Sequence, residues 1–100
     1  MADKVIVRWR DIPAQVIVKA GRRTARRQLP ERFEQAIDRA AMRAGLTGTD
    51  AYLEQWQRSA PMACGEDLEA EAEAALQALD ADYPPERLRT LVANDGREPG

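Results

Sequence analysis

The sequence predicts an α+β fold, in which an N-terminal antiparallel β-hairpin or three-stranded sheet is followed by three to four packed α-helices. Two observations lead to this class. In the first twenty positions, two strand-like apolar runs, Val5–Val7 and Val16–Val18, flank a turn, and alternate positions of the first share an apolar face. Beyond residue 30 apolar residues recur at the period of an amphipathic helix. With 100 residues the chain can bury one modest core, so we predict a single domain over 1–93 and a flexible tail over 94–100.

The first strand is predicted over residues 4–10, where alternate positions share an apolar face made of Val5, Val7 and Trp9. The next four residues, Asp11-Ile12-Pro13-Ala14, indicate a turn, because proline fixes φ and aspartate can bond nearby amides. A second strand follows over Gln15–Ala20. These two strands predict an antiparallel hairpin.

The chain after the hairpin leaves two interpretations open. Gly21 permits a tight or left-handed turn at the end of the second strand. Thr24–Leu29 then either returns as a third strand, with Ala25 and Leu29 facing inward, or forms a loop. The sheet is therefore predicted with two or three strands.

The first helix is predicted from Pro30 to Ala44, because proline suits the first helical position and Gly45 accepts left-handed geometry at the end. Its apolar stripe consists of Phe33, Ala36, Ile37, Ala40, Ala41 and Ala44. Residues 47–50, Thr-Gly-Thr-Asp, supply capping oxygens for a short second helix. The inward residues of that helix are predicted to be Tyr52, Leu53 and Trp56.

The second half of the chain begins with a predicted linker, Ser59–Gly65. The helix after this linker is rich in alanine and glutamate, and one face of it can pack. That face is made of Leu68, Ala72, Ala75, Leu76, Leu79 and Tyr83. Pro84-Pro85-Glu86 begins a last helix, whose apolar residues are Leu88, Leu91 and Val92.

The sequence contains no set of residues that could form a catalytic, metal or cofactor site by itself. Histidine is absent and Cys64 is the single cysteine, so a Ser-His-Asp, Cys-His, zinc or iron–sulfur site cannot be assembled. The acids after Gly65 lack the spacing of a calcium loop and are predicted to form a solvated helix face. We expect Cys64 to be an ordinary, partly buried cysteine rather than a reactive thiol. We therefore predict a non-enzymatic protein with no cofactor.

The N-terminal residues MADK lack the apolar segment of a signal peptide. The longest apolar runs are far shorter than the roughly 20 residues that a membrane-spanning helix needs. We expect a cytoplasmic protein without a membrane partner.

Charge is divided unequally along the chain. Residues 1–50 hold 11 Lys and Arg against 6 Asp and Glu, whereas residues 51–100 hold 4 against 11. The densest basic cluster lies at and after the end of the second strand and consists of Arg22, Arg23, Arg26 and Arg27, together with Lys19. Guanidinium groups at a hairpin end can bind phosphates or carboxylates with two parallel hydrogen bonds. The cluster therefore faces either the acidic half of its own chain or an acidic partner.

We predict a partner-binding site at two places, the turn and the arginine loop. The turn contributes Trp9, Arg10 and Asp11, and an exposed Trp9 would add a stacking surface. The loop contributes the four arginines. A protein partner is favoured over nucleic acid, because the whole chain is acidic and carries no nucleic-acid-binding motif. The alternative is a weak nucleic-acid-binding module that uses the Arg22–Arg27 loop.

Three segments resemble a small bacterial family of virulence factor domains, which in turn resembles part of conserved virulence factor C. They are VRWRDIPAQVIVKAGRR, LPERFEQAIDRAAMRAGLTGTDAYLEQW and CGEDLEAE, and the resemblance runs from Val5 to Val92. It implies a domain that occurs alone or beside iron–sulfur scaffold-like and helical-repeat modules, near corrinoid or folate methyl-transfer enzymes. No catalytic residues are carried over. The resemblance therefore implies an accessory protein that acts through protein contacts and leaves metal or cofactor chemistry to its partner.

Overall fold

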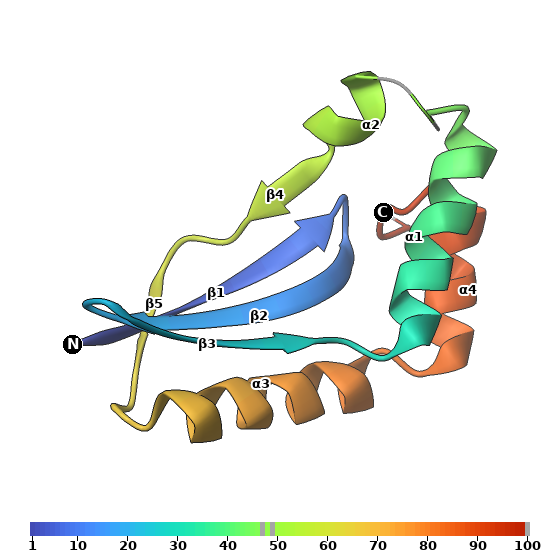
Figure 1. The fold of residues 1–100 in the computed structure, drawn as a ribbon. Helices are drawn as coiled ribbons and strands as arrows, with labels where there is room; N and C mark the ends of the chain where they lie inside the picture. The colour runs from blue at the N-terminus through green and yellow to red at the C-terminus, as the bar shows by residue number, and fades with distance from the viewer. Residues whose placement is uncertain (47, 49, 100) are drawn as a thin grey trace.

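The computed structural model describes residues 1–46, 48 and 50–99, and it confirms the predicted α+β class (Figure 1). Within these residues one antiparallel sheet is formed by β1 (Ala2–Trp9), β2 (Ile12–Ala20), β3 (Arg23–Gln28), β4 (Trp56–Arg58) and β5 (Met62–Cys64). The helices are α1 (Glu31–Ala44), α2 (Asp50–Glu54), α3 (Leu68–Asp82) and α4 (Pro85–Ala93). The strand order is β3-β2-β1-β4, and β5 pairs with β1 as well.

One face of the sheet is covered by α3, which lies along β2 and β3 (Figure 1). Because successive side chains of a strand point to opposite faces, only every second residue reaches this helix. The strand residues buried on this side are Ala2, Ile6, Val16, Val18 and Ala25, and they pack against Leu68, Ala72 and Ala75. The third strand, which the sequence left open against a loop, is thus present and contributes to the core.

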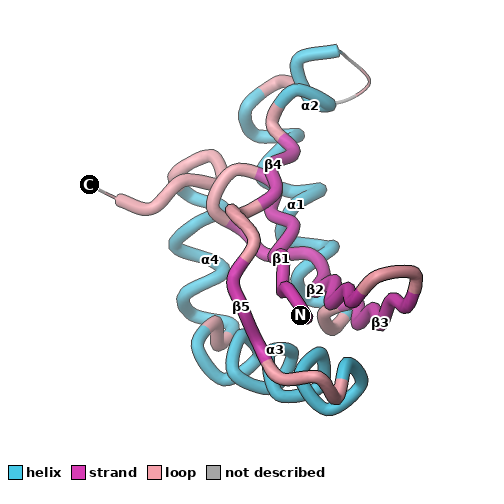
Figure 2. The backbone as a smooth tube through the Cα atoms, turned by 90° about the vertical axis from the view of Figure 1, so that its left-hand side faces the viewer, coloured by secondary structure: helices cyan, strands magenta, loops and turns pink. Residues whose placement is uncertain are grey.

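A second core lies at the end of the sheet where β1 turns into β2. Here Trp9 and Ile12 pack with Phe33, Ile37 and Leu91, so α1 and α4 close this end of the sheet (Figure 2). Full burial of an apolar side chain such as Phe33 or Leu91 stabilises the fold by roughly 1.5–3 kcal/mol. The turn between the two strands is therefore built on the core rather than held out in solvent.

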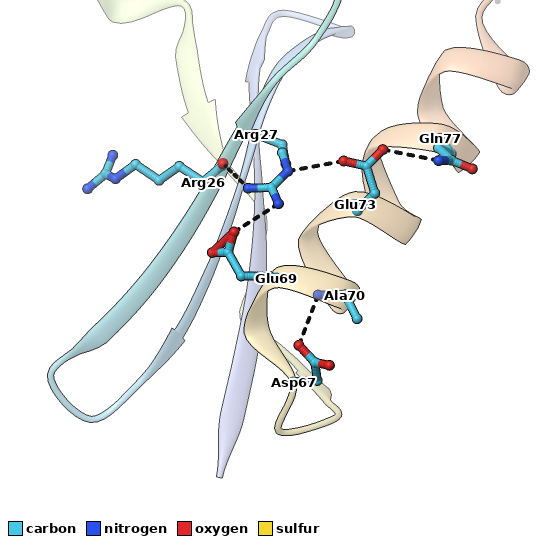
Figure 3. A network of polar contacts seen from close by, with 7 residues as sticks. All are labelled: Arg26, Arg27, Asp67, Glu69, Ala70, Glu73 and Gln77. Carbon is cyan, nitrogen blue, oxygen red and sulfur yellow. Dashed lines mark hydrogen bonds and ion pairs between the residues drawn. The ribbon is translucent and has the colours of Figure 1, made fainter.

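Local signals fix the helix ends. The residue after α1 is Gly45, whose φ of 74° is left-handed, and its N–H donates to the Met42 carbonyl. The carboxylate of Asp67 accepts a hydrogen bond from the Ala70 N–H and caps α3 (Figure 3). These ends agree with the predicted helices to within a residue or two.

The predicted second helix is shorter than expected, and its aromatic end is a strand. α2 ends at Glu54, and Leu53, predicted to face inward, is 63% exposed. Trp56 begins β4 and pairs with Trp9, because an extended chain can continue the edge of the sheet beside β1. The predicted capping by Thr47 and Thr49 lies outside the described residues.

The predicted linker Ser59–Gly65 is in part a strand. Residues 62–64 form β5, which is antiparallel to the start of β1. Ser59 holds the segment between β4 and β5, since its hydroxyl accepts from the Ile6 N–H at 2.9 Å and its own N–H donates to the Ile6 carbonyl. This segment therefore covers the edge of β1, whose backbone groups would otherwise be unpaired.

Among the helices that the structure describes, none has both the length and the apolar character needed to cross a membrane.

Candidate functional site

Trp9, the first residue of the predicted site, is fully buried and cannot offer a surface to a partner. Its indole N–H donates to the Tyr52 carbonyl at 3.0 Å, and its ring lies 5.7 Å from that of Tyr52. The stacking surface depended on exposure of Trp9, and this condition is not met. The physical reason is that α1 and α4 close over this end of the sheet and need a large apolar side chain beneath them.

Arg10 and Asp11 are held by the C-terminal segment of the same chain. The Arg10 guanidinium donates to the Asp95 carbonyl at 2.8 Å and to the Gln55 side chain at 3.0 Å. Asp11 donates its N–H to the Gly96 carbonyl, and its carboxylate accepts from the Glu98 N–H at 2.7 Å. Residues 95–98, predicted as part of a flexible tail, are thus docked on the turn. The hydrogen-bonding groups of this turn are therefore already bonded within the chain when a partner binds.

The four arginines of the loop do not lie together, because strand alternation divides them between the two faces of the sheet. Arg27 lies on the α3 side, where it contacts Glu69 at 2.9 Å and Glu73 at 3.1 Å (Figure 3). Arg26 points away from these acids in the same view. Arg27 is therefore neutralised by the acidic half of the chain, one of the two possibilities that the sequence left open.

Electrostatics at Arg27 agree with this pairing. Hydrogen bonds to Glu69 and then Glu73 raise the pKa of the guanidinium. The pKa of Glu73 is lowered, first by a hydrogen bond from Gln77 and second by the bond from Arg27. The pair is solvent-accessible, so it orients β3 on α3 and contributes little stability by itself.

The other three arginines of the loop remain available. Arg22, Arg23 and Arg26 are exposed and form no ion pair with the described residues. Arg23 lines a shallow hollow beside the start of α3 together with Glu66 and Asp67, without coming within ion-pair distance of either acid. Their role in partner binding stays a prediction.

The sheet face opposite α3 places further basic residues beside Arg26. We call it the open face, and its residues are Asp3, Val5, Val7, Gln15, Ile17, Lys19, Thr24, Arg26, Gln28, Arg58 and Ala63. Register sets Ile17 between Val5 and Arg26. Ile17 is only 1% exposed, although neither apolar core includes it. The open face therefore has a buried apolar centre, and its exposed polar residues are Asp3, Lys19, Thr24, Arg26, Gln28 and Arg58.

Arg58 is the residue of this face that sequence reasoning missed. It stands opposite Val7 because β4 pairs with β1. The strand has three residues, too few for an alternating pattern to be visible in the sequence. Together with Lys19 and Arg26 it brings three cations to a face on which Asp3 is the one acid among the residues defined above.

The described residues contain no group of three or more His, Cys, Asp or Glu side chains placed to hold a metal ion. Cys64 lies partly buried at the end of β5. Burial first, and the charge of Glu71 second, raise the pKa of its thiol, which opposes formation of a reactive thiolate.

Comparisons with known proteins identify a family. No curated protein and no solved structure matches the chain. A family model described as "Virulence factor" matches residues 7–92, a range that includes β2 to β5, α1 to α3, the end of β1 and nearly all of α4. The chain therefore belongs to the Virulence factor family.

Proposed function

We propose that this protein is a non-enzymatic adaptor that binds an acidic surface of another protein through its open face and the adjoining turn between β2 and β3, which carries Arg22. One observation carries the proposal. Trp9, Arg10 and Arg27 already make contacts within the chain. Arg22 and Arg26, in contrast, are exposed and have no ion pair among the described residues. Charged groups of this kind steer association and fix the orientation of a partner.

A protein partner suits this surface better than nucleic acid. Binding of single strands relies on exposed aromatic side chains on which bases stack. The tryptophan that the sequence offered for this purpose, Trp9, is buried. Asp3 stands opposite Lys19 in the register of β1 and β2, and its carboxylate would repel a phosphate backbone at this end of the face.

The family resemblance gives the adaptor a setting. It implies neighbours with metal-, iron–sulfur- or corrinoid/folate-dependent methyl-transfer chemistry. In the function that we propose, such a partner supplies the reactive groups and this domain supplies a rigid, charged docking face.

Affinity capture from native cytosol tests the proposal with two variants that reverse one exposed arginine each. Arg26→Glu changes the open face, whereas the matched control Arg97→Glu changes an exposed arginine outside it. We expect wild type and the control to retain the same protein and Arg26→Glu to lose most of it. Equal retention by all three proteins would remove the open face from the proposal. If nuclease treatment abolishes capture, or if the pure protein retains nucleic acid in a salt-dependent way, the nucleic-acid alternative holds instead.

A further inference from the structure

A groove between α1 and α4 lies at the end of the molecule away from the turn between β2 and β3 (Figure 1). Its floor is apolar: Ala36 and Leu88 are each 4% exposed, Val92 is half-buried, and Pro85 and Ala93 at the edge are exposed. Its volume is about 430 Å³, within the range of binding sites in proteins. The groove is thus a separate surface from the open face, and its ligand is independent of the adaptor function that we propose for that face.

Arginines from both helices surround this floor. α1 contributes Arg32, Arg39 and Arg43, whose spacing of seven and four residues brings them to one side of the helix, and α4 contributes Arg89. Among the described residues, no acidic side chain lines the groove. The side chains that line the rim are therefore basic, although the chain as a whole carries a net charge of -2.

The rim arginines differ in how far the fold already uses them. Arg32 pairs with Asp80, and Arg43 lies 3.4 Å from Asp95. Arg39 and Arg89 are exposed and form no ion pair with any described residue. Two guanidinium groups on opposite sides of the groove are thus available to a ligand that lies along it.

We infer that the α1–α4 groove binds an amphipathic helix of a partner protein, with acidic side chains that meet the arginine rim. Apolar residues at helical spacing would enter the floor, and acids on both flanks would face Arg39 and Arg89. This is the helix-in-groove mode of recognition, in which two faces of one helix are read at once. Arg32 to Arg43 spans roughly 16 Å along α1, which corresponds to about three turns of the bound helix.

Other occupants fit the groove less well. A phosphate backbone would satisfy the arginines but has no apolar side chains for the floor. The acidic helix of a second copy, α3, already uses Leu68, Ala72 and Ala75 against its own sheet. A partner helix with its own free apolar stripe meets both requirements.

The probe for a test is a fluorescent, acetylated and amidated peptide of roughly 16 residues, about 24 Å long as a helix. It carries leucines on one helical stripe and glutamates on both flanks. One control peptide replaces glutamate by lysine, and another replaces leucine by serine. Fluorescence anisotropy at low and moderate salt measures binding to the full chain.

Two double variants decide where the peptide binds. Arg39→Glu with Arg89→Glu reverses the charge of the two unpaired arginines of the rim. Arg22→Glu with Arg26→Glu makes the same change of charge in the hairpin formed by β2 and β3. We expect the first variant to bind the acidic peptide at least about tenfold more weakly than wild type and the second to bind within about twofold. Neither control peptide should bind the wild-type protein as tightly as the acidic peptide does. Far-UV circular dichroism and thermal melts confirm that both variants are folded.

Several results would overturn the inference. Loss of binding in the hairpin variant but not in the groove variant would assign the peptide to the open face. Equal binding of the serine peptide would show that the floor is not used. Displacement of the peptide by a single-stranded oligonucleotide at lower concentration would make the groove a nucleic-acid site, and no binding at low salt would remove it as a binding site.

Discussion

Replacement of Gly96 by alanine tests whether the C-terminal segment is docked on the sheet or free in solution. Gly96 has a φ of 88°, and its N–H donates to the Leu91 carbonyl at 2.7 Å. A Cβ at this position would lie 2.8 Å from Cζ3 of Trp9 and 3.3 Å from its Cε3. Both features favour glycine, one through the backbone and the other through contact with a buried ring.

The two effects have separate magnitudes. A Cβ on a left-handed residue costs roughly 1–2 kcal/mol. The indole of Trp9 is fully buried and cannot swing away, so the overpacked contact adds about 1–3 kcal/mol. Gly96→Ala should therefore lower the free energy of unfolding by about 2–5 kcal/mol and the Tm by at least about 8 °C.

Gly45→Ala is the matched control, because Gly45 has a φ of 74° but no heavy atom within 4 Å of its added Cβ. It should bear only the backbone cost of roughly 1–2 kcal/mol. Urea denaturation followed by circular dichroism measures both variants. If Gly96→Ala costs no more than Gly45→Ala, the C-terminal segment does not rest on Trp9 and the prediction of a free tail is right.

Three further predictions concern single side chains. Arg27→Ala should lower the Tm by a small amount and Arg26→Ala by less, because of the two only Arg27 joins β3 to α3 through Glu69 and Glu73; a lower Tm in Arg26→Ala than in Arg27→Ala would contradict a stabilising role of the pairing. Glu73 has a lowered pKa, so its contribution is present above the ordinary carboxyl pKa and is lost as pH falls through the lowered value; urea midpoints between about pH 6 and pH 3 should show a smaller acid-dependent loss in Arg27→Ala than in wild type. The raised pKa of Cys64 predicts that iodoacetamide alkylation reaches half its maximal rate at a higher pH than for a free cysteine, and a lower midpoint would indicate a reactive thiol.

Elements set by local chemistry could be predicted from the sequence. Pro30 and Gly45 mark the ends of α1 because each acts on its own backbone dihedral. The stripe from Leu68 to Leu79 follows from helical period alone, and it is the stripe that packs on the sheet. α2 and β4 could not be separated, since a segment of five residues carries too little periodicity to distinguish a helix from a strand.

The predicted site shows where sequence proximity fails. Arg26 and Arg27 are neighbours in the chain and lie on opposite faces of β3, so a run of arginines is not a patch. Trp9 shares its parity with Val5 and Val7, yet it enters the core whereas Val5 and Val7 lie on the open face. The register shift between Val7 and Arg8 inserts Ala14 into β2, so the alternation of β1 itself is unbroken. Trp9 enters the core because it stands at the end of β1 that α1 and α4 cover.

The basic first half of the chain is neutralised by the acidic second half at one place in the fold and only in part at another. Near the sheet, acids of α3 hold Arg27, and opposite charges from the two halves offset one another. At the α1–α4 groove the same compensation is incomplete, because Arg39 and Arg43 repel each other across one helical turn at a cost of roughly 0.2–0.5 kcal/mol and Arg89 adds to their field. Among the described residues, neither Arg39 nor Arg89 has an ion-pair partner. An acidic helix seated in the groove would supply a partner to each and relieve the repulsion.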